Sequence, residues 1–394
     1  MVQELESVMA KEPVPLTEAE RQQIVAAVKD DVIGYGPMEA LLNDPEVTEV
    51  MVNGTDAIYI ERRGKLQLSD SRFMSEDHLR RVIERICGEV GRRIDESSPM
   101  VDARLPDGSR VNAIIPPLAA KGSALTIRKF PEKALTMQDL IAKGSLTQQT
   151  ADFLEGCVLG RLNIVVSGGT GTGKTTMLNL LSGYIPEDER IVTIEDSMEL
   201  RLVQRHVISL EARQANSEGK GAVEIRDLVK NSLRMRPDRI VIGECRGGEA
   251  LDMLQAMNTG HEGSLTTAHA NSPRDMMSRL ETMVLMGELD LPVRAIRDQI
   301  ASAVDMIVQL TRLKDGRRAV TKITELTGME GDIITLSDLF DFDWTAGYTD
   351  DGGYGGVLAP TGVRPQFDER LETHGITFGP EVFGAAPDQV ERTW

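Results

Sequence analysis

The segment Gly168–Thr175 constrains the fold of this chain more than any other feature, because its sequence Gly-Gly-Thr-Gly-Thr-Gly-Lys-Thr matches a phosphate-binding loop. The apolar stretch Asn163–Ser167 precedes it and is typical of a short buried strand, while Thr176–Leu181 follows with a helical pattern. Glycines let successive backbone N–H groups turn toward one anion, and the helix N-terminus adds partial positive charge. The sequence therefore predicts a nucleotide-binding loop. A glycine-rich turn before an ordinary helix is the alternative.

The side chains of this loop have predicted roles toward ATP and Mg²⁺. We expect the Lys174 ammonium to reach the β- and γ-phosphates, and the Thr175 hydroxyl is placed to bind Mg²⁺. The predicted nucleotide-binding residues are Gly168, Gly169, Thr170, Gly171, Thr172, Gly173, Lys174, Thr175 and Thr176.

Two further predicted strands end in carboxylates. Ile191–Ile194 is followed by Glu195, and Arg239–Gly243 is followed by Glu244. Phosphoryl transfer to water needs one carboxylate that holds Mg²⁺ or its bound water, and another that orients or deprotonates the attacking water. We therefore predict catalytic roles for both glutamates, with solvated strand ends as the alternative.

A third predicted strand, Ser264–His269, ends in a histidine that follows small hydroxyl-bearing residues. A lone histidine is more often a structural residue than a catalytic one. Because this histidine ends a core strand, we expect His269 to lie near the γ-phosphate as a hydrogen-bonding sensor.

The chain divides into three predicted regions. Residues 1–130 combine hairpin signals with an amphipathic helix after the N-cap Ser75, which indicates a smaller α+β domain. In residues 131–330, helical patterns alternate with short apolar strands, which predicts an α/β domain with a mainly parallel sheet covered on both faces. Such sheets bind nucleotides at the carboxyl ends of their strands. The predicted strands of this region are Asn163–Ser167, Arg190–Ile194, His206–Leu210, Arg239–Gly243 and Ser264–His269.

Residues 331–394 form an acidic extension, with twelve acidic residues against three arginines. The stretch Asp350–Gly356 is typical of a flexible loop. The extension could be a disordered solvating tail or a docking surface. Its phenylalanines and Trp344 favour partial order, because disordered segments are poor in aromatic residues.

Composition limits the location and the partners of the chain. No apolar run approaches the roughly 20 residues that cross a bilayer, and Met1–Glu6 lacks the basic start of a signal peptide, so we expect a cytoplasmic protein. The formal net charge of −18 argues against non-specific binding to nucleic acid, which depends on cationic side chains.

Together these motifs resemble the type II/type IV secretion ATPase superfamily, and most closely the tight-adherence (Flp) pilus assembly ATPases, CpaF and TadA. The order of phosphate loop, acidic box, Arg234–Arg246 block and histidine box is the one found in that superfamily. Further segments that carry the resemblance are Asp31–Pro37, Asp102–Arg110, Gly247–Gly260 and Pro360–Pro365.

The resemblance implies a RecA-like ATPase domain joined to a smaller PAS-like N-terminal domain, assembled as a hexameric ring. By the same resemblance Glu195 is the general base, Glu244 is the Walker B acid that supports Mg²⁺, and His269 is the histidine-box residue. The implied function is Mg²⁺-dependent ATP hydrolysis that moves pilins through an inner-membrane platform, with the chain at the membrane only through its partners.

Several arginines resemble those that meet phosphate across domain or subunit boundaries in this superfamily. Each could equally be a surface or ion-pair arginine. These candidates are Arg104, Arg110, Arg128, Arg234 and Arg236.

The chain also departs from some branches of the superfamily. The scattered residues Cys87, Cys157 and Cys245 cannot supply the four-cysteine zinc motif of type II secretion and pilus-extension ATPases, and they indicate a reduced compartment. An ATPase of conjugative or effector secretion remains an alternative of the same class. A regulatory nucleotide-binding switch is an alternative of another class.

Overall fold

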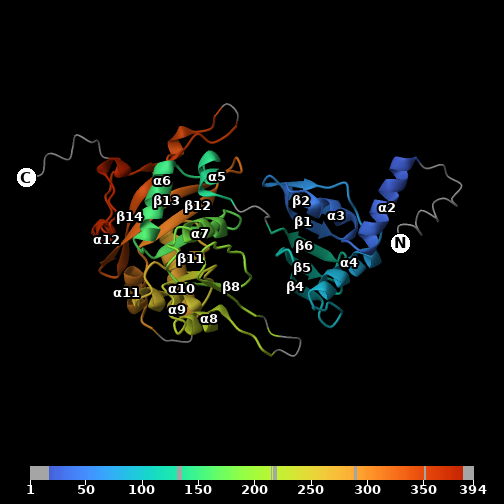
Figure 1. Cartoon of the computed structure of the whole chain (residues 1–394), viewed down its shortest axis with the longest axis horizontal. Helices are drawn as coiled ribbons and strands as arrows, with labels where there is room; N and C mark the ends of the chain where they lie inside the picture. The colour runs from blue at the N-terminus through green and yellow to red at the C-terminus, as the bar shows by residue number, and fades with distance from the viewer. Residues whose placement is uncertain are drawn as a thin grey trace, which may run out of the picture. The chain divides into compact units, whose positions relative to one another are not determined.

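A computed structural model describes residues 17–130, 135–213, 215, 220–287, 291–349 and 352–384, which belong to two compact units (Figure 1). The units are Met1–Lys133 and Ala134–Trp394. The segment Met1–Glu6 and the pair Asp350–Asp351, both interpreted from sequence, lie outside the described residues. No helix in the described part of the chain is long and apolar enough to cross a membrane.

The first unit is an antiparallel sheet with the strand order β3-β2-β1-β6-β5-β4. Helix α4 begins after Ser75, whose hydroxyl accepts a hydrogen bond from the backbone of His78, and it buries Leu79, Val82 and Ile83 in the core of the unit. The predicted helix and α+β character are confirmed. The elements are α2 (Glu18–Val32), η1 (Gly36–Met38), α3 (Glu39–Asn43), β1 (Val47–Asn53), β2 (Ala57–Arg62), β3 (Lys65–Leu68), α4 (Glu76–Glu89), β4 (Met100–Arg104), β5 (Arg110–Ile114) and β6 (Ala124–Arg128).

The second unit is built on a sheet with the order β15-β14-β13-β12-β7-β11-β10-β8-β9. From β12 to β9 neighbouring strands are parallel, and β12 to β15 continue the sheet as antiparallel neighbours. The strands are β7 (Ile164–Gly168), β8 (Ile191–Glu195), β9 (Val207–Glu211), β10 (Arg239–Ile242), β11 (Leu265–Ala268), β12 (Met306–Arg312), β13 (Arg318–Glu330), β14 (Ile333–Phe342) and β15 (Leu358–Pro360).

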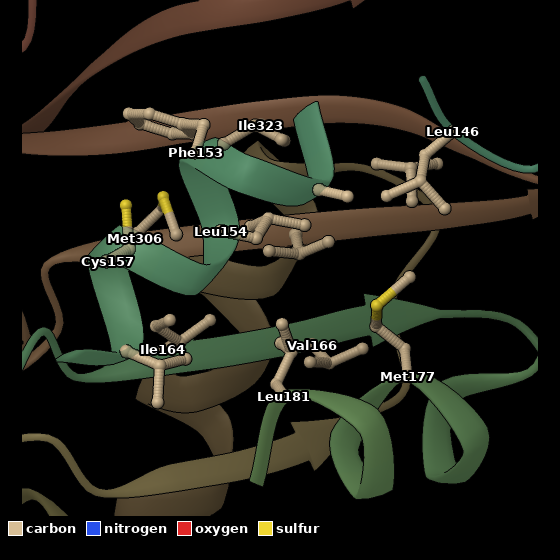
Figure 2. Packing of buried hydrophobic residues seen from close by; sticks show 14 of the residues in the cluster. Leu146, Phe153, Leu154, Cys157, Ile164, Val166, Met177, Leu181, Met306 and Ile323 are labelled. Carbon is tan, nitrogen blue, oxygen red and sulfur yellow. The ribbon is translucent and has the colours of Figure 1, made fainter. Parts of the chain in front are cut away.

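Helices cover both faces of this sheet, which explains why β7, β8, β10 and β11 are buried at every position. On one face, side chains of α6 and α7 pack against Ile164 and Val166 of β7 (Figure 2). On the other face lie α8 to α11. The predicted α/β class is therefore confirmed. The helices are α5 (Met137–Ala142), α6 (Gln148–Leu159), α7 (Lys174–Ser182), α8 (Ile225–Ser232), α9 (Glu249–Asn258), α10 (Pro273–Leu285), α11 (Val293–Ala303), η2 (Trp344–Ala346), α12 (Asp368–Thr373) and η3 (Pro380–Phe383).

The described residues of the acidic extension belong to the second unit and continue its sheet. The boundary placed at residue 330 falls between β13 and β14, which pair with each other. Beyond β15, Phe367, Phe378 and Phe383 all pack against Phe153 of α6, with ring centroids 5.2 to 6.4 Å apart. The described residues of the acidic extension therefore contribute to the core of the second unit and do not form a solvating tail.

Candidate functional site at the carboxyl edge of the central sheet

The predicted phosphate loop connects β7 to α7, as the sequence indicates. Its backbone requires glycine at specific points. Gly171 and Gly173 have φ of 71° and 95°, in the left-handed region that disfavours side chains. A Cβ on Gly168 would lie 2.7 Å from the carbonyl oxygen of Leu310 on the neighbouring strand. The loop can therefore bring its N–H groups close to an anion, with the N-terminus of α7 beside them.

Lys174 is held inside this loop. Its side chain is buried, and Nζ donates to the carbonyl oxygen of Gly169 at 3.0 Å. The same Nζ lies 3.1 Å from Nε2 of His269, which also lies 3.3 Å from the hydroxyl of Thr170. His269 reaches the loop because β11 is the parallel neighbour of β7, with Ala268 opposite Ser167. The structure thus brings the predicted lysine and histidine together.

His269 also links the loop to Glu244. Its Nδ1 contacts Oε1 of Glu244. This contact places the imidazole between Glu244 and the phosphate loop.

Arg246, to which the sequence analysis assigns no role, occupies the other oxygen of Glu244. Its Nε donates to Oε2 of Glu244 at 2.8 Å, and Nη1 lies 3.2 Å from Asp196. Although burial acts in the opposite direction, the hydrogen bond and charge of Glu244 raise the pKa of Arg246. Only its position two residues after Glu244 could have signalled this pairing from the sequence.

Glu195 ends β8 and is buried, with 3% of its surface exposed. Its Oε1 accepts from the backbone N–H groups of Glu199 at 2.9 Å and Leu200 at 3.1 Å. A Cβ on Gly243 would lie 2.8 Å from Cγ of Glu195, so the side chain packs across the strand end that precedes Glu244. These contacts fix the carboxylate at the carboxyl edge of the sheet, where the phosphate loop also lies. The assignment of Glu195 as general base stays a prediction.

The residues at this edge fit Mg²⁺ as a partner of a bound nucleotide. Within the described residues, no group of three or more His, Cys, Asp or Glu could hold a metal ion. Mg²⁺ is commonly held by one or two protein oxygens together with phosphate oxygens and water. Thr175, in the first turn of α7, and Glu244 are the oxygen donors predicted for that role.

Arg234 and Arg236 lie away from this edge. Both are exposed in the turn between α8 and β10, just before β10 begins at Arg239. Because β10 is part of the parallel sheet, its beginning lies at the edge opposite the phosphate loop of the same chain. These two arginines could meet phosphate only on a neighbouring chain.

The remaining candidate arginines form a row across the sheet of the first unit. Arg104 is the direct cross-strand partner of Arg110, and Arg110 is the partner of Arg128. Direct partners in an antiparallel pair share one face, so the three side chains are on the same face. Arg104 also lies over the ring of Phe130, 5.9 Å from its centroid. The three arginines therefore place positive charge on one face of this sheet, and their predicted contact with phosphate stays a prediction.

The chain belongs to the family of type II/IV secretion system proteins, whose model matches residues 31–332. It is 38% identical over 310 residues to the putative conjugal transfer protein Rv3659c of Mycobacterium tuberculosis (strain ATCC 25618 / H37Rv), covering 77% of this chain and 88% of that protein. It is 34% identical over 316 residues to the type IV secretion system protein PtlH of Bordetella pertussis (strain Tohama I / ATCC BAA-589 / NCTC 13251), covering 74% and 92%.

Among solved structures, the chain is similar to the Yersinia pseudotuberculosis ATPase DotB, with a TM-score of 0.54. The alignment covers 82% of this chain and 83% of DotB at 19% identity, so it supports the fold alone. The predicted superfamily and the RecA-like fold with an N-terminal domain are confirmed. Membership of a secretion ATPase family supports ATP binding and hydrolysis in general.

Proposed function

We propose that this chain is a Mg²⁺-dependent ATPase that drives transport through an envelope-spanning machine. The observation that carries the proposal is the contact chain at the carboxyl edge, in which Lys174 meets His269 and His269 meets Glu244. A regulatory switch would need the phosphate loop, but it would not need the acidic and histidine side chains beside it. Turnover of ATP by the purified protein separates the two.

Each residue has a distinct role in this proposal. Lys174 neutralises charge on the β- and γ-phosphates, and Glu195 orients the attacking water and accepts its proton. Thr175 and Glu244 would hold the metal, which would supply charge neutralisation at the transferred phosphoryl group. When the terminal phosphate is bound, His269 gives up its contact with Lys174 and donates a hydrogen bond from Nε2 to a phosphate oxygen, so that its position reports whether that phosphate is present.

We further propose that the active form is a closed ring, a hexamer by the resemblance stated above. The supporting observation is that Arg234 and Arg236 lie at the edge of the sheet opposite the phosphate loop. A cyclic arrangement gives every site the same neighbour, which could supply such arginines. Specific activity should then rise with protein concentration, and admixed Lys174→Ala subunits should depress it more than dilution does. A concentration-independent monomeric ATPase would contradict the ring.

For the cargo, we propose Flp-type pilus assembly, with the chain acting at the cytoplasmic face of the membrane on a platform protein. The segments Asp31–Pro37 and Pro360–Pro365 support this branch. Conjugal or effector transfer is the second candidate, supported by the names of the relatives Rv3659c and PtlH.

Deleting the gene in its source organism and restoring it as wild type or Lys174→Ala separates these two candidates. Loss of surface pili, counted by electron microscopy and rescued only by the wild type, is the expected result. Intact pili together with lost transfer of DNA or protein would favour the second candidate.

A further inference from the structure

The groups expected around the terminal phosphate lie on one side of the phosphate-loop strand. His269 follows β11, Glu244 follows β10 and Glu195 ends β8, and all three strands are on the same side of β7 in the sheet order. In the proposed function the terminal phosphate faces these groups, and we therefore expect the ribose and base to lie on the other side of the loop. The strands on the other side of β7 are β12 and then β13.

Two arginines stand at that side of the loop. β12 runs parallel to β7 with Leu310 opposite Gly168, and it ends two residues later at Arg312. Arg318 begins β13 and is the direct cross-strand partner of Arg312. A Cβ on Gly173, the residue before Lys174, would lie 3.7 Å from Cδ of Arg318. The exposed Arg318 side chain therefore lies against the phosphate loop on the side away from His269.

The hairpin that carries Arg318 is fixed by the C-terminal part of the chain. Asp315, in its turn, accepts from the backbone of Arg317 and of Tyr354, both at 2.8 Å. Arg317 Nη2 in turn donates to the carbonyl oxygen of Tyr354 at 2.5 Å. Tyr354 lies beyond residue 332, where the match to the family model ends. A segment outside that match thus holds the hairpin beside the loop.

We propose that Arg318 contacts the nucleoside end of the bound nucleotide, with its guanidinium stacked on the purine base. A guanidinium is planar and weakly hydrated, and it stacks on aromatic rings in a way that a lysine ammonium does not reproduce. The inference rests on the proposed function, because it takes the orientation of the nucleotide from the roles given to His269, Glu244 and Glu195.

Binding of two probes by the full-length protein tests this assignment. Mg²⁺·ADP carries a nucleoside, whereas Mg²⁺·tripolyphosphate presents phosphates alone, and both affinities can be measured by titration calorimetry. Arg318→Gln should weaken ADP binding about tenfold, as expected for a lost stacking contact, and change tripolyphosphate binding less than about twofold. Arg318→Lys should lose most of the ADP affinity as well. Lys314→Gln, in the turn of the same hairpin, removes the same charge and should change neither affinity.

Three results would overturn the inference. Equal weakening of both probes by Arg318→Gln would make Arg318 a phosphate ligand or a support of the loop. If Arg318→Gln keeps full ADP affinity and an unchanged unfolding temperature, Arg318 makes no contact that contributes to nucleotide binding. Full ADP affinity in Arg318→Lys would show that charge and not stacking is used. If the wild-type protein binds neither probe, the proposed function itself fails, which none of the other outcomes implies.

Discussion

The two edges of the central sheet both contain buried charged side chains, yet they use them differently. At the edge where the parallel strands begin, Arg239 is fully buried and donates to Glu189 and to the carbonyl oxygens of Val158 and Gly263. At the carboxyl edge, Lys174 is also buried, but it contacts Gly169 and the imidazole of His269.

The difference lies in what each edge can exchange. A carboxylate and two carbonyls around Arg239 form a closed set of acceptors that no ligand needs to replace, as expected for a buried ion pair that holds strands together. An imidazole nitrogen is a weaker partner for an ammonium than an anionic phosphate oxygen is. We therefore expect the buried charge at the carboxyl edge to bind an anion, whereas the buried charge at the opposite edge stabilises the fold.

Changing Glu195 should give the largest effect at the carboxyl edge. Glu195→Gln keeps the size of the side chain but removes the base, so kcat should fall by at least on the order of 10²-fold while Mg²⁺·ATP binding persists. Single-turnover hydrolysis and equilibrium binding measure the two quantities. An unchanged kcat would leave Glu195 as a structural acid held by the backbone of Glu199 and Leu200.

Changing Arg239 should affect stability and leave nucleotide binding unchanged. Arg239→Met leaves Glu189 with a poorer set of donors and should lower the free energy of unfolding by about 3 kcal/mol. Nucleotide affinity of the folded variant should stay the same. Arg279→Met, on the exposed side of α10, is the matched control and should shift stability by less than about 0.5 kcal/mol. Weakened nucleotide binding in Arg239→Met would contradict the purely structural role given to the edge where the parallel strands begin.

A smaller effect is expected at Arg246, whose side chain is 56% exposed. Because Arg246 occupies an oxygen of Glu244, Arg246→Gln should lower the Mg²⁺ concentration that half-saturates ADP binding. The shift should reach at most about fivefold, since exposed ion pairs contribute up to about 1 kcal/mol. A titration of Mg²⁺ at fixed ADP measures it. A higher Mg²⁺ requirement would instead show that Arg246 supports the metal site.

Local patterns in the sequence predicted most of this architecture. The loop Gly168–Thr175, the strand ends at Glu195 and Glu244, and the capped helix after Ser75 all depend on residues close together in the chain. The placement of Arg234 and Arg236 at the opposite edge follows once the strands are known to be parallel.

The features that the sequence analysis missed depend on distant pairing. β14 pairs with β13 across the boundary placed at residue 330, where the acidic composition gave no sign that the sheet continues. Arg246 contacts Asp196, fifty residues away in the chain, and the turn at Asp315 is fixed by Tyr354. A pattern within one segment carries no information about which other segment will lie beside it.

The most direct test of the account is ATP hydrolysis by the Lys174→Ala variant. The variant should fold with a near-wild-type unfolding temperature, because the proposed role of the Lys174 ammonium is to bind phosphate and not to stabilise the hydrophobic core. Its turnover should be lower by at least on the order of 10²-fold, because the variant lacks the ammonium that is predicted to reach the β- and γ-phosphates. A folded Lys174→Ala protein that hydrolyses ATP at nearly the wild-type rate would contradict the assignment of this site.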